Sequence, residues 1–165
     1  AQDRNGNLVH TGPTPLPALG ATDQHSLLQL LMEGPRDKVV LFVGVSGAED
    51  PVEIPRIRQE FSALSYLGGH TLAELLETER RATMEALRQE DRWNLAVEVD
   101  TLSPRALGAL FMLFQIATVY AGALYGVNPL DQPGVELGKR LTYGLLGREG
   151  FEKPELGTGG VSWRV

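Results

Sequence analysis

The 165-residue sequence contains no cysteine. This absence excludes disulfide bonds and thiolate metal sites, and it fits a cytoplasmic protein. Positive charge is also scarce, because 15 lysines and arginines face 21 acidic residues and leave a formal net charge of −6. No basic cluster offers the phosphate contacts that nucleic acids require, so we expect no nucleic-acid partner. The polar start of the chain, residues 1–7, predicts no signal peptide.

Charge is missing altogether from one long stretch, residues 106–127. This run is long enough to cross a bilayer. Gln115, Thr118 and the lack of basic residues just beyond the run argue against insertion, so we expect no membrane partner. We predict instead a fully buried helix, in which Gly122 and Gly126 allow a close approach to a neighbouring helix.

Helical and strand patterns alternate along the chain. Three prolines before residue 20 exclude an early helix and leave room only for a short extended segment near 16–19. The apolar run within 38–45 is typical of a strand covered on both faces of a parallel sheet. The other expected elements are helices over about 23–33, 71–90, 103–126 and 133–146, and a strand over 94–99. This order predicts an α/β fold, a three-layer sandwich around a parallel sheet with right-handed crossovers.

Local signals support the helix boundaries. Thr22 or Asp23 can serve as the N-cap of the first helix, and Ser103 followed by proline is a typical start for the long uncharged one. In the helix over 71–90 we expect an i,i+4 ion pair between Glu77 and Arg81. Composition marks no internal domain boundary, so we expect one domain or part of one.

Two helix starts carry the polar residues of most interest. Residues 20–26 read Gly-Ala-Thr-Asp-Gln-His-Ser and place His25 in a first helical turn. Residues 131–139 read Asp-Gln-Pro-Gly-Val-Glu-Leu-Gly-Lys and set Gln132 and Lys139 about two turns apart on one face. Such a pair can bind an anionic, hydroxyl-rich ligand. From the residues alone, a surface helix with a solvated lysine and a histidine that only caps is the more common arrangement.

The two segments together resemble the glucose-6-phosphate isomerase family. Its members carry a ring-opening histidine in a Gly-Thr/Ala-x-x-Gln-His stretch, and a glutamine and a lysine at the substrate in a later Asp-Gln-x-Gly-Val-Glu-x-x-Lys stretch. The resemblance, from about residue 9 to 147, implies that His25 and Lys139 are catalytic and that Gln132 binds substrate. It departs at Leu130, where many members have an aromatic residue.

The resemblance also implies what the rest of the protein is. The family's general-base glutamate lies in a Glu-Ser-x-Gly-Lys segment, which this sequence lacks. We therefore interpret residues 1–165 as the C-terminal part of the second sugar-isomerase (SIS) domain, ending in a helix from about 133 and a Gly-rich tail. Its five-stranded sheet would be incomplete here, and the upstream part of the same enzyme would be a partner.

The expected activity is interconversion of glucose 6-phosphate and fructose 6-phosphate, through ring opening and an enediol, in a homodimer with no cofactor or metal. The isolated chain would be inactive. Two other hypotheses remain open, a non-catalytic sugar-phosphate-binding regulatory module and an inert fragment. Glu136 is expected to orient Lys139 or Arg140 through an ion pair. No role is assigned to His10, His70, Trp93 and Trp163, or to the polar connection over 46–69.

Overall fold

The computed structural model describes residues 2–3, 5–10, 12–47 and 51–157. Trp163 and most of the Gly-rich tail lie outside the described residues. The chain divides into two compact units, one formed by Thr14–Phe111 and the other by Ala1–Pro13 with Met112–Val165. The expectation of one domain, or part of one, stays a prediction.

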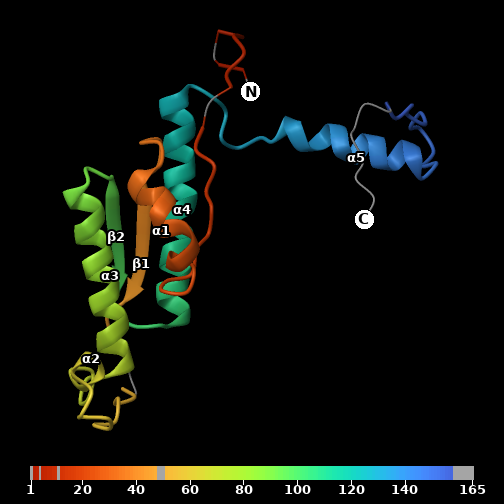
Figure 1. Cartoon of the computed structure of the whole chain (residues 1–165). Helices are drawn as coiled ribbons and strands as arrows, with labels where there is room; N and C mark the ends of the chain where they lie inside the picture. The colour runs from red at the N-terminus through yellow and green to blue at the C-terminus, as the bar shows by residue number, and fades with distance from the viewer. Residues whose placement is uncertain (1, 4, 11, 48–50, 158–165) are drawn as a thin grey trace. The chain divides into compact units, whose positions relative to one another are not determined.

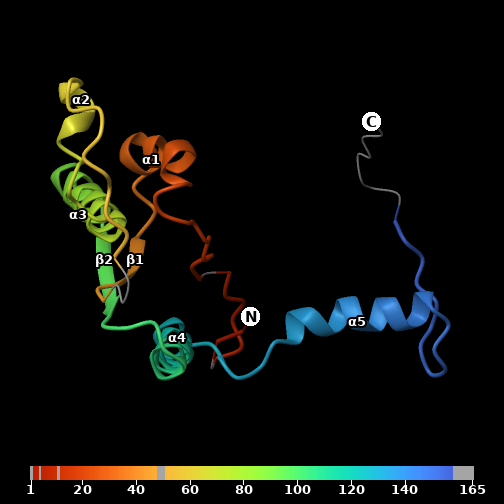
Figure 2. The same ribbon diagram turned by 90° about the horizontal axis from the view of Figure 1, so that it is seen from below.

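The first unit is an α/β unit built on a parallel pair of strands (Figures 1 and 2). Its two strands pair in register from Val40↔Asn94 to Val45↔Val99, and α3 lies beside β2. The α/β class and the parallel pairing are therefore confirmed. The elements, in chain order, are α1 (Gln24–Glu33), β1 (Val40–Val45), α2 (Ser62–Ser65), α3 (Leu72–Gln89) and β2 (Asn94–Val99).

Helix α3 begins where its sequence predicts. The hydroxyl of Thr71 accepts a 3.0 Å hydrogen bond from the backbone N–H of Glu74, which satisfies one of the unpaired donors of the first turn. Leu87 on the inner face of α3 is 0% exposed, and among the described residues it is the only large hydrophobic side chain that is fully buried. The core of this unit is therefore centred on the last turns of α3.

Arg80 joins α3 to β2. Its guanidinium, 13% exposed, donates two 2.7 Å hydrogen bonds to the Glu77 carboxylate and one of 2.8 Å to Glu98 on β2. The predicted partner of Glu77, Arg81, was therefore wrong. Arg81 carries the same guanidinium but is exposed, whereas Arg80 is partly buried and lies within reach of Glu98, so one Arg80 side chain can bind Glu77 through two nitrogens and β2 as well.

This arrangement predicts a pH dependence. The hydrogen bond and charge of Arg80 lower the pKa of Glu77 below its usual 4.5. Because the folded-state pKa is lowered, the stabilisation is present above the ordinary pKa and is lost as the pH falls through the folded-state value. Glu77→Gln should therefore reduce the loss of thermal stability between about pH 5 and pH 3. Glu79→Gln on the same helix is the control, and an unchanged acid dependence in Glu77→Gln would contradict the prediction.

The second unit contains α5 (Pro133–Leu145) and most of α4 (Pro104–Tyr125). The Ser103 hydroxyl accepts a hydrogen bond from the N–H of Ala106 at 3.2 Å, which confirms the expected N-cap of α4. At the other end Gly126 has a φ of +69°, so it ends the helix in a left-handed conformation rather than packing against another helix. Gly122 lies against Pro129, where an added Cβ would come within 2.5 Å of the proline Cβ.

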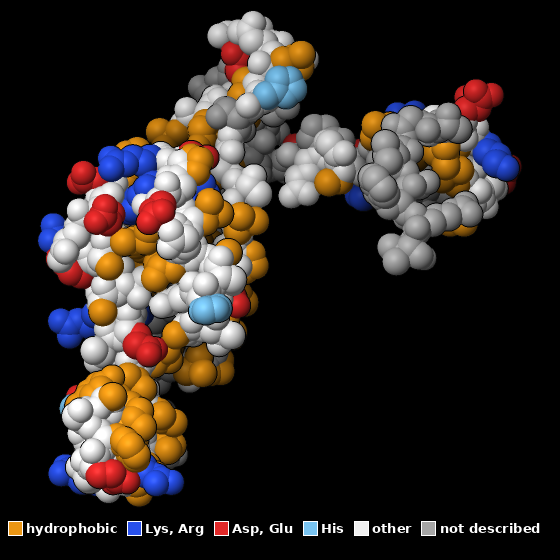
Figure 3. Space-filling model, in the orientation of Figure 1, with side chains coloured by type: hydrophobic (Ala, Val, Ile, Leu, Met, Phe, Trp, Pro, Cys, Tyr) orange, Lys and Arg blue, Asp and Glu red, His pale blue; other side chains and the backbone are white. Residues whose placement is uncertain are grey.

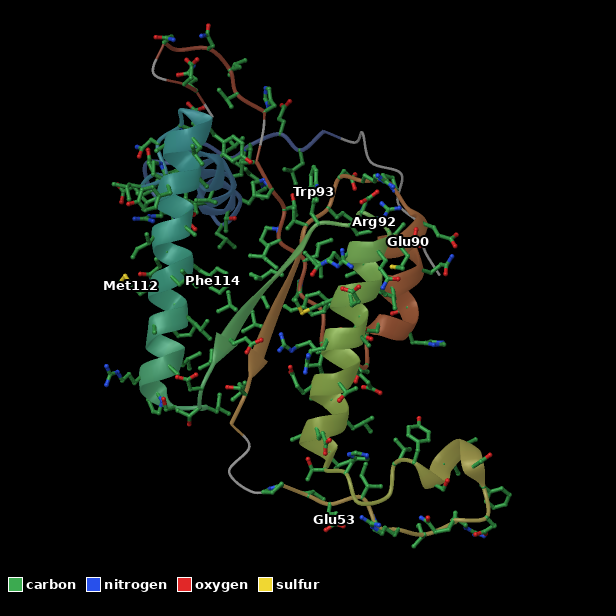
Figure 4. All side chains as sticks on the ribbon, turned by 90° about the vertical axis from the view of Figure 1, so that its left-hand side faces the viewer. Glu53, Glu90, Arg92, Trp93, Met112 and Phe114 are labelled. Carbon is green, nitrogen blue, oxygen red and sulfur yellow. The ribbon has the colours of Figure 1, made fainter. Side chains whose placement is uncertain are left out.

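The prediction that α4 is fully buried is wrong for this chain. Only Gly122 of its residues is buried, and Leu124 is 87% exposed. Met112 and Phe114 project from the helix in Figure 4, and hydrophobic side chains are widespread on the surface in Figure 3. Apolar side chains such as those of α4 are normally buried against other parts of a protein, but the described residues cover few of them. Among those residues α4 is the one helix long and apolar enough to span a bilayer, on length and composition alone, with a mean hydropathy of 1.8.

The remaining segments are mostly irregular. Residues 16–19 are not helical, as expected, but they form no strand, and Leu16 there is 83% exposed. The connection after β1 contains the short α2 and an isolated bridge between Glu53 and Thr71, and its residues 48–50 lie outside the described part. Near the N-terminus, an isolated antiparallel bridge joins Asp3 to Val127.

Candidate active site

His25 is the second residue of α1 and is exposed. Asp23 occupies the N-cap position, as expected, but its carboxylate does not cap the helix. It accepts a 2.6 Å hydrogen bond from the backbone N–H of Leu19 and so fixes the turn that leads into α1. The Gly20–Ala21 peptide within this turn is cis. Because His25 is exposed in the first turn, its imidazole is presented at the N-terminal end of α1.

Two side-chain hydrogen bonds attach α1 to the rest of its unit. The Thr83 hydroxyl of α3 donates to the amide oxygen of Gln24, next to His25, at 3.3 Å. At the far end of α1, Arg92 donates to the carbonyl of Gly34 at 2.8 Å, from the turn between α3 and β2 that Figure 4 labels. These two bonds set the position of His25 relative to α3 and the sheet.

Gln132 stands at the N-cap position of α5 and is exposed. Its side chain makes no capping hydrogen bond, and its backbone N–H donates to the Asp131 carboxylate at 2.8 Å. The proline that follows occupies the first turn, as the sequence predicts. An amide side chain at a helix start, where the helix dipole favours negative charge, suits an oxygen-rich anionic ligand.

Lys139 lies about two turns further along α5. Its ammonium donates a 2.6 Å hydrogen bond to Oε1 of Glu136, and both side chains are about half exposed. The expected ion pair of Glu136 is thus confirmed, with Lys139 rather than Arg140 as its partner. Gln132, Glu136 and Lys139 follow one another at spacings of three or four residues, so they lie along one face of α5.

The structure brings Gln132 and Lys139 together on one helix, whereas His25 belongs to the other compact unit. An open groove between α3 and β2 contains none of these three residues. Its lining includes as many acidic as basic side chains, so its charges do not favour an anionic ligand over a cationic one. The described residues contain no group of three or more His, Cys, Asp or Glu placed to hold a metal ion.

His70 shows the ordinary role that a histidine near a helix start often has. Its Nδ1 lies 2.9 Å from the Glu74 carboxylate, and this contact is the main cause that lowers the pKa of Glu74. Sequence reasoning missed a ring cluster at the end of α5, in which Arg148 stacks on Tyr143 and Phe151. A tyrosine in the last turn of the helix, with an arginine and a phenylalanine shortly after it, was the available signal.

Comparisons with known proteins agree with the resemblance of the segments that contain His25, Gln132 and Lys139. The family model described as phosphoglucose isomerase matches residues 2–149. A glucose-6-phosphate isomerase of Rubrobacter xylanophilus is 49% identical over 140 residues, and one of Carboxydothermus hydrogenoformans is 44% identical over 151. These matches cover 85% and 92% of this chain but 32% of each relative. The chain therefore spans about a third of the length of the curated relatives it matches.

The fold comparison agrees as well. A crystal structure of a hypothetical protein from Thermus thermophilus superposes with a TM-score of 0.78 at 44% sequence identity, over 88% of this chain and 34% of that one. The matched region includes the segments of His25, Gln132 and Lys139, because the family model runs from residue 2 to residue 149. The chain belongs to the phosphoglucose isomerase family.

Proposed function

We propose that this chain is the C-terminal part of a glucose-6-phosphate isomerase, which interconverts glucose 6-phosphate and fructose 6-phosphate when it is joined to its upstream part. The observation that carries the proposal is the family match over residues 2–149, together with the retention of His25, Gln132 and Lys139 at the motif positions. A module that only senses a sugar phosphate has no need for a ring-opening pair.

The chemistry divides between this chain and the missing part. Ring opening moves a proton to the ring oxygen and removes one from the anomeric hydroxyl. A histidine exchanges protons near neutral pH, and a lysine ammonium can donate to the ring oxygen, so we assign ring opening to His25 and Lys139. The amide of Gln132 holds substrate oxygens. The proton transfer between adjacent carbons, through the enediol, belongs to a glutamate of the upstream part.

The upstream part would also complete the fold. The pair β1 and β2 would join further strands in the parallel sheet of a three-layer SIS domain, and the apolar surface of α4 would be covered. This cover accounts for the lack of charged residues in α4 after Arg105, since most of its apolar side chains are exposed to solvent among the described residues. We further propose a cytoplasmic homodimer that works without a cofactor, as the family resemblance implies.

A coupled assay of fructose 6-phosphate conversion tests the proposal. The chain is assayed alone, and again after mixing or fusing it with the upstream part of the same enzyme. Activity only in the combined sample supports a split isomerase whose general base lies upstream. Activity in this chain alone would contradict the placement of that base. Binding of sugar phosphate without turnover in the combined sample would favour the regulatory module.

Gln132→Ala should chiefly weaken substrate binding in the joined enzyme. Removing one uncharged hydrogen-bonding side chain that acts in both ground and transition states raises KM by about tenfold and leaves kcat within about twofold. Steady-state kinetics with fructose 6-phosphate measure both constants. Gln29→Ala, the same change at an exposed glutamine of α1, is the control. An unchanged KM in Gln132→Ala would show that this side chain does not contact substrate.

A further inference from the structure

Four side chains follow one another along a single face of α5. Gln132 stands at the helix mouth, Glu136 and Lys139 follow, and Tyr143 completes the row near the end of the helix. Their spacings of four, three and four residues keep them on one face. Two of the four, Gln132 and Lys139, are those assigned to the substrate, and Glu136 lies between them.

The direction of the Lys139 side chain is set by its bond to Glu136. Long side chains on a helix lean toward the N-terminus of the helix, which for Lys139 is the direction of Gln132. The Glu136 carboxylate lies in that direction and accepts the hydrogen bond at 2.6 Å. A glutamate three residues before a lysine is the favourable order for such a pair. The bond therefore limits a flexible ammonium to the side of α5 that carries Gln132.

The helix beneath this pair is held at its far end. Tyr143 and Phe151 meet edge to face with ring centroids 5.0 Å apart, and Arg148 stacks over Tyr143 at 4.3 Å. Gly144 is buried, and a Cβ there would lie only 2.0 Å from the carbonyl oxygen of Glu152. The segment after α5 thus packs against its last turn. The Glu136–Lys139 pair sits on a helix that is anchored, which a positioning role requires.

We propose that Glu136 is a positioning residue for ring opening, which holds the Lys139 ammonium on the Gln132 side of α5 and takes no proton itself. This inference rests on the proposed function. Because Glu136 acts only through Lys139, the loss of Glu136 should slow only the step that needs the Lys139 ammonium, which is ring opening. A substrate that needs its ring opened depends on Glu136, and a substrate that is already open does not.

The test uses the full-length isomerase that contains this chain and two substrates. Fructose 6-phosphate is ring-closed in most molecules, whereas 5-deoxyfructose 6-phosphate lacks the hydroxyl that closes the ring and stays open. Glu136→Gln should lower kcat on fructose 6-phosphate by about tenfold and leave turnover of the open analogue within about twofold. Glu136→Asp keeps the charge on a shorter side chain and should recover part of the lost rate.

Two further variants make the result specific. Glu85→Gln removes a comparable exposed glutamate from a 2.7 Å, i,i+3 pair with Arg88 on α3, so it should leave both rates unchanged. The double variant Glu136→Gln with Lys139→Ala should lose no more activity than Lys139→Ala alone, because the two residues act as a unit.

Four outcomes would overturn the inference. A wild-type rate in Glu136→Gln, while Lys139→Ala is slow, rejects Glu136 and leaves the proposed function standing. Equal losses on both substrates would show that Glu136 supports the helix, for instance through its charge in the first turn, and not ring opening. No loss in Lys139→Ala rejects both the site and the inference, and no turnover by the wild-type enzyme rejects the proposed function.

Discussion

Lys139→Ala in the joined isomerase is expected to slow turnover of ring-closed fructose 6-phosphate by roughly 100- to 10,000-fold, the usual range for a general acid. The ammonium that donates to the ring oxygen is removed, and alanine keeps the helix intact because it is the best helix former. Turnover of 5-deoxyfructose 6-phosphate should fall far less, since no ring has to open. The measurement is kcat on each substrate, followed by product formation.

Arg140→Ala is the matched control for this prediction. Arg140 is the next residue of α5 and also an exposed cation, but Glu136 pairs with Lys139 and not with it. Its loss should change kcat by no more than about twofold, as for an ordinary surface substitution. His25→Ala should share the preference for ring-closed substrate. A Lys139→Ala enzyme that slows both substrates equally would argue against a ring-opening role.

Leu87→Ala is expected to destabilise the unit around α3 by about 2–5 kcal/mol, through the lost burial and the cavity left behind. Leu87 is 0% exposed and is the only fully buried large hydrophobic side chain among the described residues, so little else replaces its contacts. A loss of this size is a large share of the stability of an ordinary domain. Urea unfolding of the chain, followed by circular dichroism, measures the change.

Leu76→Ala on the same helix provides the comparison. Leu76 is 50% exposed, so the same truncation removes fewer buried contacts and leaves no cavity. The helix propensity changes equally in the two variants, which isolates the effect of burial. Equal destabilisation in both variants would mean that the core does not lie at the end of α3.

The helices and strands of this chain could be predicted closely from local signals. The strand Asn94–Val99 has the predicted bounds, and Ser103 caps α4 with its hydroxyl as expected. These signals act within one turn or a few residues, so a single sequence contains them. The ion pair of Glu136 was predictable for the same reason, because its two candidate partners lie three and four residues away.

What failed depended on partners distant in the sequence. Arg80 rather than Arg81 binds Glu77 because Glu98 on β2 also attracts the guanidinium, and helix spacing alone contains no information on that strand. The burial of α4 was predicted from composition, which shows that a helix requires an apolar surrounding but not that this chain supplies it. The segment over 16–19 could become a strand only beside a neighbouring strand, and the described residues place none there.

The parallel pairing of β1 with β2 also bears on how quickly this unit can fold. The Ser46 hydroxyl bonds to the carbonyl of Val99, 53 positions along the chain, and the whole ladder has a similar separation. The chain must close this loop before the pairing gains any free energy, so contacts of high sequence separation slow folding. Helix α3 lies within the loop and can form first from local interactions. The assembly of the two strands, rather than the formation of any helix, should therefore limit the rate at which this unit reaches its native state.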